Sequence, residues 1–262
     1  MTADIGVMMY TVLDQARADL AGTLARLAAM GYVGIETYGL VEHFGPVVMR
    51  SAIGAAGLRL TSAHTPFPAG PGAAAALDLN EELGAEVLVW SMEQEEFDSP
   101  EAIRRGVARV NEAADRAADR GMRIAYHNHH AEFSQMFDGR RAYDLLLELL
   151  DDRVLIELDA YWALLGGADP AEILTRLGDR VRFVHVKDGP ATSYERDVMV
   201  PIGEGQLDWT RTLTVPSGLR WHIVELERLH IDTFEALQRS YDHLVGNGLS
   251  HGTVAVDIGE RA

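Results

Sequence analysis

Ionisable residues recur in pairs at the ends of short β-type segments in this 262-residue chain. Four consecutive segments end in pairs spaced two residues apart: His127 and His129, Glu157 and Asp159, His185 and Lys187, and Glu225 and Glu227. Two earlier segments carry one such residue each, Glu36 and His64. Because alternate residues of a strand face the same side, both members of a pair face one way. Buried carboxylates and imidazoles are costly unless they are paired or bind a metal, so the recurrence indicates a functional centre.

The ionisable residues predict a site for one divalent metal ion. Carboxylate oxygens and imidazole nitrogens together suit Mn²⁺, Mg²⁺, Co²⁺, Fe²⁺ or Zn²⁺, of which we favour Mn²⁺. The expected core ligands are Asp159, His185 and Glu225. The β-type segment that ends near residue 127 supplies the fourth ligand, either Glu132 or His127. The chain has no cysteine, which excludes disulfides, thiol nucleophiles and a closed zinc site built on thiolates.

Some of these residues have a structural explanation beside the functional one. For His64, a hydrogen-bonded structural role and a functional role are equally good interpretations. Glu157 lies between Ile156 and Leu158, where it fits either an interior packing layer or a pairing with a buried cation. Five further histidines are assigned to surface or packing positions: His43, His222, His230, His243 and His251.

Strand-like segments alternate with longer segments of helical periodicity, which is typical of parallel strands joined by helices. Eight strands are predicted, at residues 5–9, 33–38, 58–64, 86–91, 122–128, 154–159, 181–187 and 220–226. Amphipathic helical segments are predicted at residues 14–30, 99–120, 139–150, 169–177 and 232–245. This α/β pattern predicts a single (β/α)8 TIM barrel over residues 1–262, with a doubly wound open sheet as the second alternative. Active sites of such barrels lie at the carboxyl ends of the strands, where the paired residues fall.

Local signals mark several boundaries. Ser99 and Asp169 each precede a proline and are expected to cap helices, whereas Gly31, Gly57, Gly84 and Gly121 are expected to end them.

The low-complexity segment at residues 70–76 is expected in a loop, and the long connection at residues 189–219 is expected to be functional. A C-terminal tail from about residue 246 is either an element used for oligomerisation or a loose end.

The charge of the chain excludes several classes of partner. Lysine and arginine total 23 against 40 aspartates and glutamates, which gives a net charge of −17. Such a surface repels phosphate backbones and anionic lipids, so nucleic acids and membranes are not expected partners. The first residues lack the basic start of a secretion signal, and no apolar run is long enough to span a membrane. We therefore expect a soluble cytoplasmic protein, with homo-oligomerisation left open.

Seven motifs resemble, in this order, the sugar phosphate isomerase/epimerase superfamily of xylose isomerase-like TIM barrels. They are GYVGIETYG (31–39), HTPFP (64–68), YHNHHAEF (126–133), ELDAYWALLGGADP (157–170), FVHVKDG (183–189), GEGQLDW (203–209) and VELE (224–227). The resemblance covers nearly the whole chain and implies that Asp159, His185 and Glu225 bind a metal. It does not fix the substrate, because such relatives include ketose 3-epimerases, inosose dehydratases, dehydroshikimate dehydratases, keto-sugar lyases and endonuclease IV.

Two positions depart from the ketose epimerases. Those enzymes place a glutamate ligand at the end of the fifth strand, where this chain has His127, with Glu132 following five residues later. They also carry a substrate-contacting histidine where this chain has Trp162. At these positions the chain instead resembles the subgroup that contains inosose dehydratase-like proteins and proteins that process 3-keto-glycosides.

The implied chemistry is the removal of a proton next to a carbonyl. A divalent ion can chelate the carbonyl and the adjacent hydroxyl of a keto-sugar or keto-polyol, and so stabilise the enediolate. Isomerisation, epimerisation and elimination all share this step. The candidate bases are Glu225, His127 and His129, and Lys187 is expected to hold an oxyanion or a hydroxyl.

The substrate is therefore expected to be a small carbohydrate. Its expected contacts are Glu36, His64 and Trp162, and Trp209 is a further candidate for stacking on a sugar face. Two alternatives stay open: a non-catalytic sugar- or metal-binding barrel, and a subunit that needs a partner chain for activity. Endonuclease activity is disfavoured by the charge of the chain and by too few histidines for a trinuclear zinc site.

Overall fold

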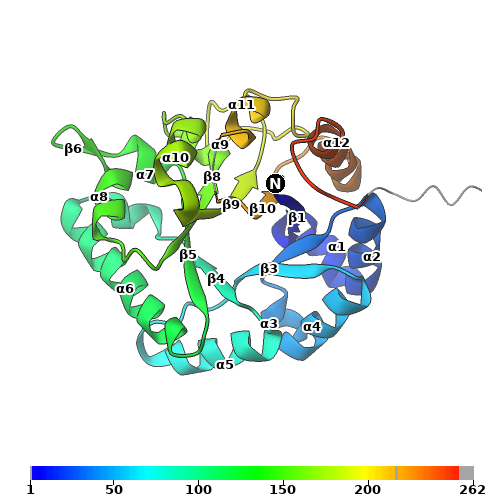
Figure 1. Ribbon diagram of the computed structural model, residues 1–262, viewed down its shortest axis with the longest axis horizontal. Coiled ribbons are helices and arrows are strands. Elements are labelled where there is room, and N and C mark those ends of the chain that lie inside the picture. Colours follow the sequence, from blue (N-terminus) through cyan, green and yellow to red (C-terminus); the bar gives the residue numbers. More distant parts are fainter. Residues whose placement is uncertain (1, 216–217, 254–262) are drawn as a thin grey trace, which may run out of the picture.

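The computed structural model describes residues 2–215 and 218–253, which form a closed barrel of eight parallel strands (Figure 1). The strands are β1 (Asp4–Met8), β2 (Gly34–Tyr38), β3 (Arg59–His64), β4 (Val87–Trp90), β5 (Arg123–His127), β8 (Leu155–Asp159), β9 (Val181–Val186) and β10 (Trp221–Val224). Neighbours in the barrel follow the order of the chain, and the barrel closes where β1 pairs with β10. The predicted (β/α)8 fold is confirmed, and each predicted strand overlaps an observed one.

Helices surround the barrel (Figure 1). The longer ones are α2 (Leu20–Met30), α4 (Pro46–Ala55), α5 (Ala73–Leu83), α6 (Pro100–Ala118), α8 (Ala142–Leu149), α10 (Pro170–Leu177) and α12 (Thr233–Gly246). The shorter ones are α1 (Leu13–Ala18), α3 (Val41–Phe44), α7 (Ala131–Ser134), α9 (Ala160–Leu165) and α11 (Trp209–Leu213). A small antiparallel hairpin, β6 (Met136–Phe137) with β7 (Arg140–Arg141), lies between α7 and α8 in the chain.

The expected helix caps are present. The Ser99 hydroxyl accepts a hydrogen bond from the Ala102 amide at 3.2 Å, and the Asp169 carboxylate accepts one from the Ala171 amide at 3.0 Å. Gly31 ends α2 with a φ of 103°, a left-handed conformation that glycine adopts without steric cost. These local signals fix where α2, α6 and α10 begin or end.

Two local predictions were wrong. The segment at residues 14–30 is two helices, because the Asp19 side chain accepts a hydrogen bond from the Gly22 amide at 2.9 Å and starts α2. An aspartate that caps the next helix competes with continuation of the preceding one. In the segment at residues 70–76, the alanines form the first turn of α5 rather than a loop. Alanine has the highest intrinsic helix propensity, which explains that outcome.

The interior of the barrel is filled by a layer of apolar side chains beneath the polar residues. This layer consists of Met8, Val89, Ala125, Leu155, Phe183 and Ile223, all buried and packed together. Because side chains on a strand alternate between two faces, the inward-facing residues two positions later on the last four strands are the ionisable ones. They are His127, Glu157, His185 and Glu225. The strand period therefore directs these side chains into the mouth of the barrel.

The end of the chain returns to the first strand. His251 forms a bridge with Asp4, and its Nδ1 lies 2.9 Å from the Asp4 carboxylate. The remainder of the expected tail, residues 254–262, lies outside the described residues. Within the described chain, no helix has both the length and the apolar character needed to cross a membrane.

Candidate active site

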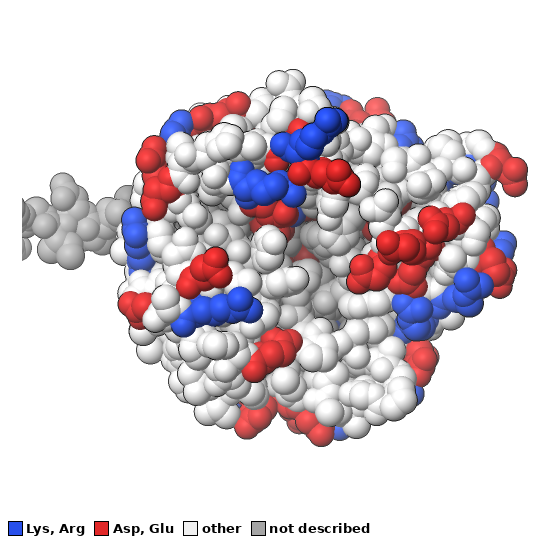
Figure 2. Space-filling model, turned by 180° about the vertical axis from the view of Figure 1, so that it is seen from behind, with Lys and Arg blue, Asp and Glu red and all other residues white. Residues whose placement is uncertain are grey.

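The face opposite to the one seen in Figure 1 is hollowed near its centre, and side chains of both charges lie around the hollow (Figure 2). A cavity of about 300 Å³ lies at the carboxyl ends of the strands. Its walls include His64, His127, His129, His185 and Glu225, which come from four different strands or the residues that follow them. The cavity is of a size that admits a small molecule, near the lower end of the roughly 300–1,000 Å³ typical of ligand pockets.

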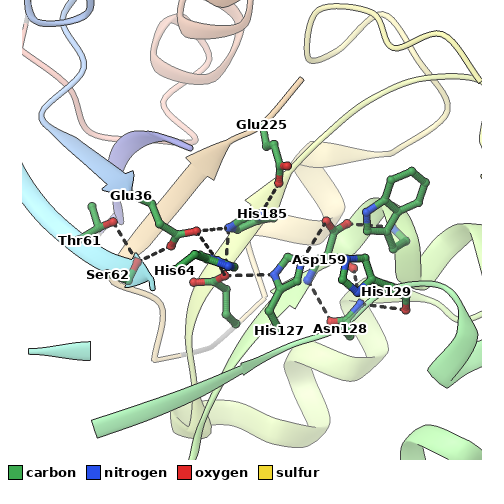
Figure 3. Close-up of polar contacts among 12 residues, drawn as sticks. Glu36, Thr61, Ser62, His64, His127, Asn128, His129, Asp159, His185 and Glu225 are labelled. Carbon is green, nitrogen blue, oxygen red and sulfur yellow. Dashed lines mark hydrogen bonds and ion pairs between the residues drawn. The ribbon is translucent and has the colours of Figure 1, made fainter. Parts of the chain in front are cut away.

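His185 is at the centre of the polar contacts (Figure 3). Its Nδ1 lies 2.6 Å from Glu225 Oε2, and its Nε2 lies 3.0 Å from both Glu36 Oε1 and Glu157 Oε1. Burial disfavours the charged imidazole, but the carboxylates of Glu157 and Glu36 hold the pKa of His185 well above its usual value. His64 Nε2 also contacts Glu36 Oε1, at 2.8 Å.

Glu157 orients two histidines through the ring nitrogens that face away from Asp159 and Glu225. Its Oε1 lies 3.1 Å from His127 Nδ1 and 3.0 Å from His185 Nε2. The other nitrogens of the two rings, His127 Nε2 and His185 Nδ1, thereby face the Asp159 and Glu225 carboxylates. A carboxylate on the far nitrogen of a metal-binding histidine is a recurrent arrangement in metal sites. Glu157 thus acts as a positioning residue between the two rings.

Two groups of side chains bring potential metal-ligating atoms together. One consists of Asp159, His185 and Glu225, and the other of His64, His127, Glu157 and His185. Asp159 Oδ2 is buried and makes no hydrogen bond within the described residues, although Lys187 Nζ lies 3.1 Å from it and His127 Nε2 lies 4.0 Å from it. A buried carboxylate oxygen beside imidazole nitrogens fits a divalent cation. The first group, extended by His127, is therefore the better candidate for a metal site, because Glu157 already contacts both imidazoles from the other side.

Lys187 places a buried ammonium among three carboxylates. Its Nζ lies 2.9 Å from Glu225, 3.1 Å from Asp159 and 3.1 Å from Glu227. Burial disfavours the charged amine, yet these carboxylates hold the pKa of Lys187 well above its usual value. The ammonium also lies 4.9 Å from the centre of the Trp162 ring, a cation–π distance. Lys187 therefore remains charged in the cavity wall.

Asp159 is held in place from its own helix and from β5. Its Oδ1 accepts a hydrogen bond from the Trp162 amide at 2.8 Å, which starts α9. Asn128 donates to the Asp159 carbonyl and accepts from its amide, so the ends of β5 and β8 are joined. Burial raises the pKa of Asp159 to about 6.

The model of the xylose isomerase-like TIM barrel family matches residues 24–215. The chain belongs to this family. An inosose dehydratase of Geobacillus kaustophilus (strain HTA426) is 34% identical to this barrel over 101 residues, which span 38% of this chain and only 30% of that protein. A solved sugar phosphate isomerase/epimerase of Parabacteroides distasonis ATCC 8503 superposes with a TM-score of 0.78 at 22% identity, covering 96% of each chain. The IOLI protein with a bound zinc atom gives a TM-score of 0.70 at 18% identity, covering 94% of this chain and 97% of that one.

The xylose isomerase-like barrel brings most of the expected site residues together, with exceptions. Glu36 lies behind the cavity wall, fully buried, and bonds with Ser62 as well as His64 and His185. Glu132 is not brought to the core ligands, because its Oε1 accepts from the Tyr126 hydroxyl at 2.9 Å and the His129 amide at 3.0 Å. Burial raises the pKa of this Glu132 carboxyl to about 8.

The two expected stacking tryptophans have different positions. Trp162 lines the cavity, although only 1% of its surface is exposed. Trp209 packs beneath the long connection after β9, where its Nε1 donates to Asp188 at 3.1 Å, and it does not line this cavity. Asp188 also accepts from the amides of Gly189 and Gly203, so the tryptophan anchors this loop instead of meeting a ligand there.

Several wall residues were not predicted from the sequence. Tyr10, Tyr38, Tyr194, Ser91 and Glu93 all line the cavity. The three tyrosines are about two-fifths exposed, and Tyr10 meets Tyr38 edge to face at 5.1 Å. An exposed tyrosine just after a strand is a weak signal by itself, because loops that meet in space are far apart in the chain.

Proposed function

We propose that this barrel is a divalent-metal-dependent isomerase, epimerase or lyase that removes a proton next to the carbonyl of a keto-sugar or keto-polyol. The observation that carries the proposal is the convergence of Asp159, His185 and Glu225 beside a cavity that His129 also lines. The inosose dehydratases, of which this chain matches less than half the length, support a keto-polyol as one substrate class. Mn²⁺ is the ion we favour.

The ion would be held by Asp159, His185 and Glu225, with His127 as the fourth ligand in place of Glu132. When bound, it supplies positive charge that polarises a substrate carbonyl and makes the neighbouring C–H more acidic. Glu157 keeps the imidazoles of His127 and His185 turned toward this position. Orienting contacts of this kind are as important to a metal site as the ligands themselves.

His129 is the base that the geometry favours among the three candidates. Glu225 contacts His185 and Lys187, and His127 contacts Glu157, whereas no hydrogen bond of the His129 ring is found among the described residues. Burial and the charge of Lys187 lower the pKa of His129 to about 3. Its ring is therefore neutral at pH 7 and can accept a proton. Because such a ring is a weak base, the step depends on an acidified C–H.

The Lys187 ammonium and Trp162 complete the proposed site. Lys187 Nζ can donate to a substrate hydroxyl or to an oxygen on which negative charge develops, because it stays protonated. Trp162 offers a rigid apolar wall next to it. His64 lines the cavity and contacts Glu36, so it can donate to substrate while remaining oriented.

Solvent-deuterium exchange tests the proposal. Metal-loaded protein in D₂O, with a panel of keto-sugars, inososes and 3-keto-glycosides, should exchange the proton next to the carbonyl of at least one compound, as followed by NMR. His129→Ala should reduce the exchange at least 100-fold, as expected when a general base is removed (roughly 10²–10⁴-fold). It should retain the metal, measured by elemental analysis. His43→Ala, which removes an exposed histidine, is the control.

Identical spectra from chelator-treated and metal-loaded protein for the whole panel would refute the proposed activity. A carbohydrate-binding barrel without turnover would then be indicated if calorimetry still detected binding of a panel compound. A subunit that needs a partner chain would be indicated if exchange appeared only after a second chain was added.

A further inference from the structure

A second cavity adjoins the one at the metal site. It has a volume of about 270 Å³ and lies between the residues that follow β4 and those that follow β5. The two cavities share Ser91, Glu93, His129 and Tyr194 as wall residues. The two cavities are therefore neighbours at His129 and Tyr194, and we call the second one the side chamber.

Two residues of the side-chamber wall carry buried polar atoms without partners. Glu132 is fully buried and lines the chamber, and its Oε2 makes no hydrogen bond in the described part of the chain. His130 Nδ1, in the same wall, is also buried without a partner among those residues. Leaving such atoms unsatisfied is costly, so they point to a ligand with hydroxyl groups that can donate and accept.

The charge of the walls excludes an anionic ligand. Among the described residues, neither lysine nor arginine lines the side chamber, whereas the carboxylates of Glu93 and Glu95 do. In the neighbouring cavity the lining lysine is Lys187, and three carboxylates already surround it. A phosphate or carboxylate group would meet like charges here without a free cation to pair with.

Tyr194 gives the side chamber an aromatic wall. Its ring stacks on His130 with centroids 4.4 Å apart and lies 5.0 Å from the Trp162 ring. It is 38% exposed, so part of the ring is open to a ligand. The apolar face of a sugar ring packs well on such a surface, while its hydroxyls bond at the edges.

We propose that the substrate has two rings, of which the reacting keto ring occupies the cavity at the metal site and a second, uncharged polyhydroxylated ring occupies the side chamber. This inference rests on the proposed function and narrows its substrate class to uncharged glycosides or disaccharides. Glu132 and His130 bind hydroxyls of the second ring, and Tyr194 packs against its face.

The test compares a 3-keto-hexose with a 3-keto-disaccharide that carries the same reacting ring, using deuterium exchange catalysed by the metal-loaded protein. The disaccharide should have a kcat/KM at least tenfold higher. Tyr194→Ala should remove most of this advantage, because it lowers the kcat/KM of the disaccharide more than that of the hexose. Tyr10→Ala is the matched control, because Tyr10 has a similar exposure and lines the first cavity but not the side chamber, so it should affect both compounds alike.

A charged analogue completes the experiment. The same disaccharide with a phosphate on its second ring should exchange at least tenfold more slowly than the uncharged one. Equal kcat/KM for hexose and disaccharide, equal effects of Tyr194→Ala on both, or a preference for the phosphate would each overturn the inference while exchange of the hexose upheld the proposed function. If neither compound nor any other keto-sugar exchanged, the proposed function would fail and this inference with it.

Discussion

Replacing Glu157 with glutamine should weaken metal binding without removing a ligand. Glu157 Oε1 lies 3.1 Å from His127 Nδ1 and 3.0 Å from His185 Nε2, so one carboxylate orients two of the proposed ligands. Loss of an orienting partner typically costs about 10–100-fold in metal affinity, or about 1.4–2.8 kcal/mol. Glutamine keeps an oxygen that can accept one of these hydrogen bonds, so the fold should be retained. We therefore expect a 10–100-fold rise in the Kd of Glu157→Gln.

Competition with a chromogenic chelator measures this change for Mn²⁺ and for Zn²⁺. Asp159→Asn, which alters a proposed ligand, should lose more affinity than Glu157→Gln. Glu227→Gln is the control, because it removes a carboxylate of the same cavity that contacts Lys187 but none of the proposed ligands. If Glu157→Gln lost more affinity than Asp159→Asn, the ion would be bound by the group that contains His64 and Glu157, and the assignment would be refuted.

Three further outcomes are expected. Lys187→Met should bind Mn²⁺ more tightly than the unaltered protein, because it removes an ammonium 2.9 Å from Glu225, while exchange slows; weaker binding in the same chelator assay would contradict this. Burial lowers the pKa of His222 to about 4, so below about pH 6.5 the unfolded chain takes up a proton at this residue before the folded chain does. Between pH 7.5 and pH 5 this difference should cost the protein about 2 kcal/mol of unfolding free energy, a loss that His222→Gln should not show. Urea unfolding of both proteins at the two pH values measures it. Ser99→Ala should cost about 1 kcal/mol, seen as a lower urea midpoint with an unchanged m-value, because Ser99 caps α6.

The strand positions and the inward-facing residues followed from the sequence because both depend on a period of two. Phe183, His185 and Lys187 illustrate this, since the first packs in the barrel layer and the next two reach successive levels of the mouth. The ionisable pairs at the ends of the other predicted strands located the residues that face the mouth of the barrel there. Local rules also gave the caps at Ser99 and Asp169.

Other features depend on contacts between segments that are distant in the chain. Glu157 had two equal interpretations, and its pairing with two histidines is set by the closure of the barrel. Glu132 was expected as one of two alternatives for a ligand, but α7 turns its carboxylate toward Tyr126. Tyr194 lies on the long connection after β9, whose path over His130 has no periodic signal in the sequence.

An anomalous difference map from crystals grown with Mn²⁺ would locate the ion and its ligands. We expect one strong peak within about 2.0–2.3 Å of Asp159 Oδ2, His185 Nδ1, Glu225 Oε2 and His127 Nε2, with Glu157 beyond coordinating distance on the far side of both imidazoles. A peak coordinated by Glu157 and His64 would contradict the assignment of the ligands. A map without any peak in the mouth of the barrel, at saturating Mn²⁺, would contradict the metal centre itself.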